Sequence, residues 1–193
     1  MAGIEHNLSF DPETHQYWVD GEEVLSVTQI LKSCCIIDDT WFTEVARQRG
    51  QAIHLATEYL DQNDLNWDSI SPKIAGYVKS YKQFKSDVDF TIERIECPFF
   101  NPTYRFAGTP DRVGIIHGEK TILDLKIGQR ADWHRLQTAG YALLMGNGYK
   151  RYGLYLTNKG TYNLDEHRNH QDYNVFLSGL TVANWNKRNG KGN

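Results

Sequence analysis

The sequence predicts an α/β (α+β) protein in which helices flank a central mixed β-sheet. Segments whose apolar residues recur at helical spacing are interleaved with segments rich in strand-forming residues, and the strand-like segments gather in the middle of the chain. The length of 193 residues suffices for one domain with a hydrophobic core and is marginal for two. We therefore expect a single domain over residues 1–193.

The first 40 residues are expected to form a hairpin followed by a short helix. Apolar and polar residues alternate there across turn signals at residues 11–12 and 20–21. Ser26, followed by Gln29, has the spacing of a helix-capping box, so a helix is expected to begin beside it.

The rest of the chain is expected to form a core over 41–167 and a C-terminal helix with a basic tail over 168–193. The expected elements are helices over 41–62 and 71–86, strands near 90–98, 104–107, 111–117 and 120–127, a helix near 132–146, strands near 150–157 and 160–165, and a last helix ending at about 187.

Composition excludes several classes of protein. Hydrophobic residues make up 40% of the chain and charged residues 23%, and the mean hydropathy is -0.58, which is typical of a globular protein. No apolar run approaches the roughly 18 residues that span a bilayer, and the N-terminus lacks the features of a signal peptide. Three cysteines without a CxxC pair predict neither structural zinc nor an iron–sulfur cluster. We expect a cytoplasmic protein without a membrane partner.

The net charge of -3 is unevenly distributed. Residues 1–40 contain eight acids and one lysine, a local charge of -7, which leaves +4 on the rest of the chain. A basic surface opposite an acidic end is compatible with a polyanionic partner, and a solvated basic tail is the simpler alternative.

Residues 108–126 place two carboxylates and a lysine within strand-forming sequence. Because side chains alternate along a strand, Asp124 and Lys126 share one face. A hairpin with its turn at residues 118–119 would set Asp111 opposite Lys126 and diagonal to Asp124, so that both carboxylates reach one ion. The alternative is a surface ion pair worth ~0–1 kcal/mol.

Clustered carboxylates on a partly buried sheet face repel one another and lose hydration, and a divalent cation relieves both costs. Oxygen ligands without cysteine select Mg²⁺ or Mn²⁺. A neighbouring lysine can hold water or stabilise the charge that develops on phosphorus. Together these groups predict metal-assisted phosphodiester hydrolysis.

A larger pattern resembles the PD-(D/E)xK nuclease superfamily, and in particular its RecB-like, phage-type exonuclease branch. The shared features are a P-D, a D-x-K, a histidine on an earlier helix and a Q-x-x-x-Y on the following helix, here Pro110-Asp111, Asp124-Leu125-Lys126, His54 and Gln137 to Tyr141. The resemblance covers roughly residues 8–157. It implies a restriction-endonuclease-like core, with 41–167 as the catalytic part and without the iron–sulfur cluster of some members.

The resemblance also implies the ligands of a metal ion. Asp111 and Asp124 would bind Mg²⁺ or Mn²⁺, with His54 as a further ligand. The backbone carbonyl of Leu125 is expected to coordinate as well, and Glu96 is an additional candidate.

Other residues are expected to act on the substrate. Lys126 would position or activate the attacking water, while Gln137 and Tyr141 would steady this lysine or the DNA backbone. Basic and aromatic residues near the centre in sequence are expected to contact DNA without reading bases: Arg105, Arg112, Arg130, Arg135 and Trp133.

The expected function is a metal-dependent DNA exonuclease that acts on single- or double-stranded ends and serves phage or mobile-element recombination or replication. A structure-selective endonuclease and an inactive nuclease-like DNA-binding module are the alternatives. A phage recombinase or a single-strand-binding protein is a candidate partner. The expected location is the cytoplasm of a phage- or bacterium-type host cell, with mitochondria left open.

Overall fold

The computed structural model describes residues 6–12, 14–38, 43–146 and 148–191, and its strands form two five-stranded sheets. The N-terminal sheet has the strand order β1 (Leu8–Asp11), β2 (Gln16–Val19), β3 (Glu22–Ser26), β6 (Phe106–Gly108), β5 (Phe99–Asn101). The main sheet has the order β10 (Tyr162–Glu166), β9 (Lys150–Leu156), β8 (Glu119–Ile127), β7 (Arg112–Ile116), β4 (Phe90–Ile95). Both are mixed, because β3 pairs in parallel with β6 and β8 with β9.

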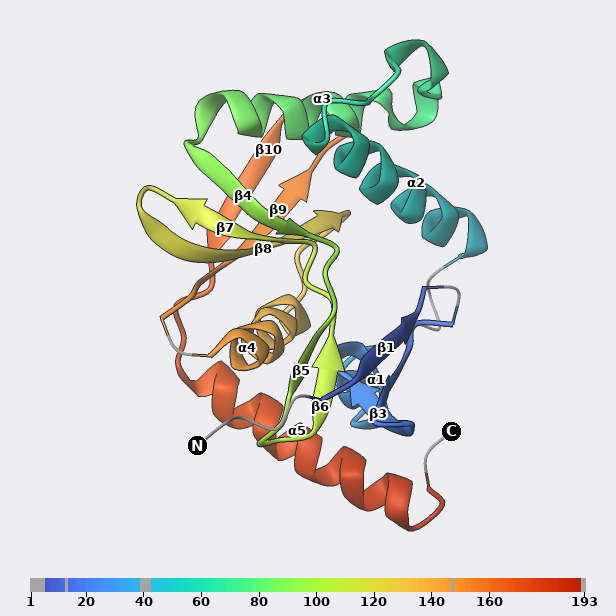
Figure 1. The fold of residues 1–193 in the computed structure, drawn as a ribbon. Helices are drawn as coiled ribbons and strands as arrows, with labels where there is room; N and C mark the ends of the chain where they lie inside the picture. Colours follow the sequence, from blue (N-terminus) through green and yellow to red (C-terminus); the bar gives the residue numbers. More distant parts are fainter. Residues whose placement is uncertain (1–5, 13, 39–42, 147, 192–193) are drawn as a thin grey trace.

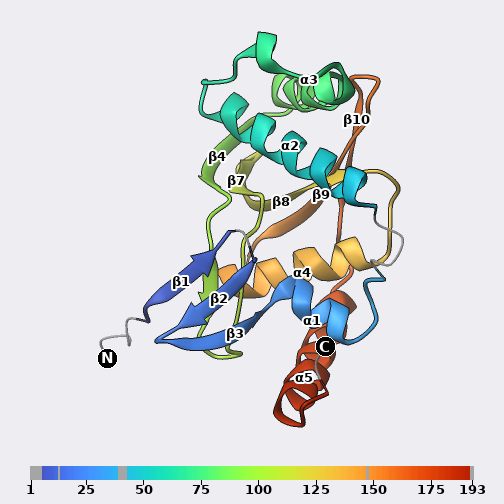
Figure 2. The same cartoon turned by 90° about the vertical axis from the view of Figure 1, so that its right-hand side faces the viewer.

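Helices cover both faces of the main sheet (Figures 1 and 2). On one face lie α2 (Glu44–Asp61) and α3 (Pro72–Asp87), which are joined through a short 3₁₀ turn (Trp67–Ser69). On the other face lies α4 (Trp133–Met145), which packs against α1 (Val27–Ser33) and α5 (Gln171–Arg188). This confirms the predicted α/β architecture, a mixed sheet flanked by helices.

Successive side chains of β8 point to opposite faces of the sheet, and this explains why apolar clusters lie on both faces. Leu123 and Leu125 belong to the apolar cluster under α2 and α3, whereas Ile122 belongs to the cluster that includes α4, α1 and α5. The odd-numbered residues of β8 therefore point toward α2 and α3, and the even-numbered residues point toward α4.

Most predicted elements are confirmed, with shifted ends. The helix predicted over 41–62 begins at Glu44, and residues 41–42 lie outside the described residues. Ser26 and Gln29 form the predicted capping box, with the Ser26 hydroxyl accepting from the Gln29 N–H at 3.1 Å. Beside the predicted central sheet, the N-terminal strands pair with β6 and with the unpredicted β5 to make a second sheet.

The predicted register of the β7–β8 hairpin was wrong. Ile116 pairs with Glu119, so the turn is at residues 117–118 rather than 118–119. His117 and Gly118 both have positive φ, 50° and 79°, as a type I′ turn requires, and His and Gly adopt that region more readily than Glu. The slip is two residues, so no side chain changes face, but the extended register sets Asp111 opposite Asp124 rather than Lys126.

Two of the crossings that the chain makes between the two sheets lie side by side. After β4 it passes into the N-terminal sheet through residues 96–98, and it returns between β6 and β7 through residues 109–111. The Glu96 N–H donates to the Asp111 carbonyl at 3.0 Å, so the two crossover segments run side by side. We call the region where they meet the seam.

No helix within the described ranges is long and apolar enough to cross a bilayer.

Two helical glycines offer a matched test of the packing. A Cβ at Gly140 in α4 would lie 2.6 Å from the Phe176 ring and 2.9 Å from Val27, whereas a Cβ at Gly50 in α2 meets nothing within 4 Å. We expect Gly140→Ala to cost ~1–3 kcal/mol of unfolding free energy by overpacking. Gly50→Ala should gain up to about 1 kcal/mol through helix propensity. Urea unfolding measures both, and a stabilised Gly140→Ala would contradict the packing of α4 on α5.

Candidate metal centre

The seam gathers three potential metal ligands from distant parts of the chain. His54 comes from α2, and Glu96 and Asp111 come from the two crossover segments. One ligand atom of each lies within 4.8 Å of the others, and we call these three residues the ligand cluster. The His54 Nδ1 is 3.4 Å from Glu96 Oε1 and 3.5 Å from Asp111 Oδ1. Two carboxylates and an imidazole thus converge on one volume.

Backbone geometry aims these side chains at one another. Glu96 has a φ of 43°, a left-handed conformation that non-glycine residues rarely adopt. Asp111 is fixed by its Oδ2, which accepts from the Leu125 N–H at 2.5 Å. Such a conformation persists only where the surrounding structure fixes the backbone, as the two crossover segments do here.

Burial and charge in the seam shift the pKa of two members of the ligand cluster, Asp111 and His54. Burial raises the pKa of Asp111, with Glu96 adding to the effect and His54 opposing it. Burial lowers the pKa of His54, but the carboxylates of Asp111 and Glu96 outweigh it, so the net shift is upward. Both shifts favour the protonated forms of Asp111 and His54.

Asp124 lies beside the ligand cluster, on β8, and is 1% exposed. Its Oδ2 receives no hydrogen bond from the described residues, although Lys126 Nζ is 2.6 Å away. Burial raises the pKa of Asp124 to about 6 despite that ammonium, and the charge of Asp111 adds to the rise. A buried carboxylate oxygen with unused acceptor capacity is what a metal ion would satisfy.

The structure brings Lys126 to the two residues predicted to steady it. Lys126 Nζ donates to Gln137 Oε1 at 2.7 Å, and Gln137 Nε2 donates to the Tyr141 hydroxyl at 2.9 Å. Both partners lie on α4 at i,i+4 spacing. The ammonium also lies 5.1 Å from the centre of the Trp133 ring. The lysine is thus held from three sides.

Arg112 corrects one prediction. It was expected to contact DNA, but its side chain is fully buried and bonds to Asp61 at 2.6 Å. The prediction failed because it treated the residue next to Asp111 as a surface cation, whereas that residue is buried. Its odd-numbered partner, Leu123, faces α2, and so does Arg112.

The other predicted DNA contacts lie in two places. Arg130 and Arg135 are exposed near the start of α4, where they pair with Asp165 and Asp172. Trp133 is half-buried between them in sequence and packs beside Lys126. Arg105 lies instead on the turn between β5 and β6 and pairs with Glu22 at 2.9 Å. The Leu125 carbonyl and all direct DNA contacts remain predictions.

Sequence reasoning missed several residues that shape the seam. Thr57 and Asp61 follow His54 at i+3 and i+7, so they share its helix face, which is a signal that could have identified them. Tyr17 had no such signal. Its hydroxyl is 2.7 Å from Thr109 Oγ1, and this contact ties the N-terminal sheet to the second crossover segment.

Comparisons with solved structures find distant likeness. No protein-family model and no curated protein match the chain. The solved structure described as SSO0001 is similar, with 13% identity, a TM-score of 0.45 and coverage of 83% of this chain and 75% of that one. The alkaline exonuclease LHK-Exo from Laribacter hongkongensis is 12% identical, with a TM-score of 0.40 and coverage of 86% and 93%. Its complex with dAMP is 13% identical, with a TM-score of 0.41 and coverage of 87% and 94%. Such remote likeness assigns no activity, so function must be inferred from the site.

The raised pKa of Asp124 gives a pH dependence that can be measured in EDTA. The folded protein keeps the Asp124 proton up to about pH 6, whereas the unfolded chain releases it above its ordinary value of 3.8. The unfolded state then binds fewer protons in this window, so stability falls as the pH rises through it, by at most about 3 kcal/mol from this group.

Asp124→Asn removes this contribution, so urea unfolding between pH 4 and 7 should show a flatter profile for the variant. His54 and Asp111 remain in both proteins, so the difference reports Asp124 together with its electrostatic interaction with these two groups. Identical profiles for the two proteins would contradict the buried, proton-binding carboxyl.

Proposed function

We propose that this chain is a Mg²⁺- or Mn²⁺-dependent deoxyribonuclease that hydrolyses phosphodiester bonds at DNA ends. One observation carries the proposal: the ammonium group of Lys126 is held by Asp124 beside the ligand cluster. Phosphodiester hydrolysis needs both a cation to polarise the phosphate and fixed positive charge for the transition state.

The donor set suits a hard divalent ion. It offers carboxylate oxygens from Glu96 and Asp111, one imidazole nitrogen from His54 and the unsatisfied oxygen of Asp124, and no thiolate. Oxygen ligands favour Mg²⁺ and Mn²⁺, and Mn²⁺ also accepts imidazole. When bound, such an ion supplies Lewis-acid polarisation of the scissile phosphate.

Lys126 has the donor capacity for a direct role. An ammonium has three N–H donors. One donates to Gln137 Oε1 at 2.7 Å, and the ammonium also forms an ion pair with Asp124 Oδ2, 2.6 Å away. The remaining donors can reach the attacking water or a non-bridging phosphate oxygen. Gln137, itself bonded to Tyr141, keeps the ammonium from swinging away from the ligand cluster.

The surroundings suit a DNA backbone. Arg130 and Arg135 lie exposed near the N-terminal end of α4, the helix that supplies Gln137, and would hold phosphates without reading bases. Action at DNA ends and a place in phage or mobile-element recombination rest on the sequence resemblance, as does partnership with a recombinase or a single-strand-binding protein.

Digestion of end-labelled DNA tests the proposal. Linear single- and double-stranded substrates should be degraded with Mg²⁺ or Mn²⁺, and EDTA should stop the reaction, because the phosphate is no longer polarised. Covalently closed circular DNA should stay intact. Cutting of the closed circle would identify an endonuclease instead, and no cleavage of any substrate with either ion would refute nuclease function.

Lys126→Ala should reduce cleavage by at least ~100-fold, because the transition state loses a fixed positive charge. DNA binding, measured by filter retention, should change only slightly, since the arginines remain. Lys120→Ala is the matched control: this lysine lies on the same strand but is exposed, with its Nζ 5.8 Å from the centre of the Tyr149 ring. Full activity in Lys126→Ala would remove the lysine from the mechanism.

A further inference from the structure

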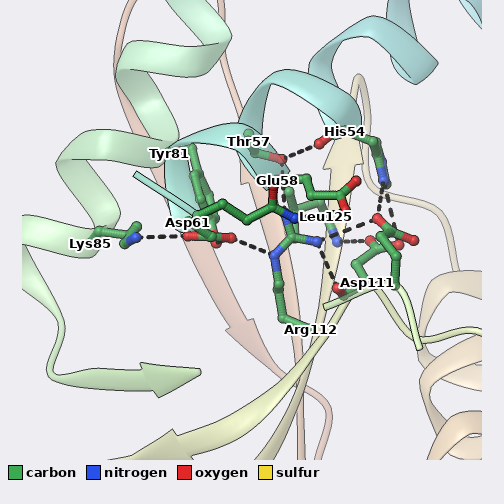
Figure 3. A network of polar contacts seen from close by, with 11 residues as sticks. His54, Thr57, Glu58, Asp61, Tyr81, Lys85, Asp111, Arg112 and Leu125 are labelled. Carbon is green, nitrogen blue, oxygen red and sulfur yellow. Dashed lines mark hydrogen bonds and ion pairs between the residues drawn. The ribbon is translucent and has the colours of Figure 1, made fainter. Parts of the chain in front are cut away.

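Arg112 forms hydrogen bonds in several directions at once, from the first position of β7 (Figure 3). Its side chain has no exposed surface. Nε donates to Asp61 Oδ2 at 2.6 Å and Nη2 donates to Thr57 Oγ1 at 3.2 Å. Nη1 donates to the Asp111 backbone carbonyl at 2.6 Å and to Glu96 Oε1 at 3.3 Å. Two members of the ligand cluster are therefore direct partners of this guanidinium.

The third member is reached through one hydroxyl group. Thr57, which accepts from Arg112, donates its own hydroxyl proton to the His54 backbone carbonyl at 2.8 Å. Figure 3 shows the Thr57 hydroxyl bonded on one side to the His54 backbone and on the other to Arg112. One planar group thus contacts or indirectly holds every residue of the ligand cluster.

Asp61 fixes the guanidinium from the opposite side. Its side chain is also fully buried, and it accepts from Tyr81 at 2.8 Å and from Lys85 at 2.7 Å, both on α3. A buried guanidinium without a partner would cost several kcal/mol, so the pair keeps Arg112 in place inside the fold. The anchor and the ligand cluster therefore lie at opposite ends of one rigid fork.

We propose that Arg112 is a positioning residue of the metal centre. Anchored by Asp61, its guanidinium sets the spacing of the ligand cluster so that one divalent cation can be bound by all three side chains. The inference rests on the proposed function, in which the ligand cluster binds a divalent cation. A purely structural ion pair would stabilise the fold without changing the affinity for the ion.

The test is Mn²⁺ binding to the metal-stripped full chain. Binding is measured as the loss of the EPR signal of the free ion. Arg112→Lys keeps the positive charge but cannot contact all the partners of the planar fork. We expect it to raise the Mn²⁺ Kd by ~10–100-fold, the usual effect of losing a group that orients metal ligands.

Arg151→Lys is the matched control. Arg151 lies on β9 of the same sheet and is 3% exposed, and it bonds to Asp172 at 3.1 Å and to the carbonyls of Arg135 and Asn169. The same substitution should lower the free energy of unfolding there and leave the Mn²⁺ Kd unchanged. A folded Arg112→Lys with the wild-type Kd would overturn the inference.

Two further variants keep the test decisive. If Arg112→Lys does not fold, Thr57→Val decides, because it keeps the side-chain shape while removing the hydroxyl between Arg112 and His54. A raised Kd supports the inference and a wild-type Kd refutes it. If Arg112→Lys folds, it should change the Mn²⁺ Kd much less in a Glu96→Gln background, because Arg112 and Glu96 act through one contact. Fully additive effects of the two substitutions on the binding free energy would count against the inference.

Wild-type protein that bound no Mn²⁺ would refute the proposed metal centre itself, and this outcome is distinct from a variant that binds as the wild type does.

Discussion

The structure depends on keeping acidic side chains together inside the fold. Asp111 and Asp124 are almost completely buried, and burial raises the pKa of both. The β7–β8 hairpin supplies a cation on each side of its sheet to offset this cost: Arg112 points toward α2, and Lys126 points toward α4. The acids are thus held between two fixed positive charges, which limits their repulsion and leaves ligand oxygens directed at one volume.

Joining two sheets creates the place where this happens. A single sheet would leave Asp111 at the free end of a strand, whereas here the chain enters β7 from the N-terminal sheet and the first crossover segment pairs with it through Glu96. Tyr17 holds the second crossover segment through Thr109. The left-handed conformation of Glu96 is tolerated because both neighbouring strands fix the backbone around it. The N-terminal strands therefore support the site as well as the core.

Much of the candidate site was predictable because it follows from local rules. Gln137 and Tyr141 at i,i+4 had to share a helix face, and Asp124 and Lys126 at i,i+2 had to share a strand face. The register was predicted wrongly because the prediction placed the turn at Gly-Glu. The turn instead uses His117 and Gly118, which both have positive φ. An even-numbered slip kept every side chain on its predicted face, so the predicted clustering survived an incorrect pairing.

The sequence by itself determined the helices and strands, the faces on which their side chains lie and the charged groups available for chemistry, since these depend on residues a few positions apart. Only the tertiary structure decided that the N-terminal strands build a second sheet, that Glu96 joins His54 and Asp111, and that Arg112 is buried rather than exposed. These contacts join residues dozens of positions apart, and their distances are set by how the helices pack on the sheet. Burial, which decides whether a charge meets solvent or another charge, is a property of that packing and not of local sequence.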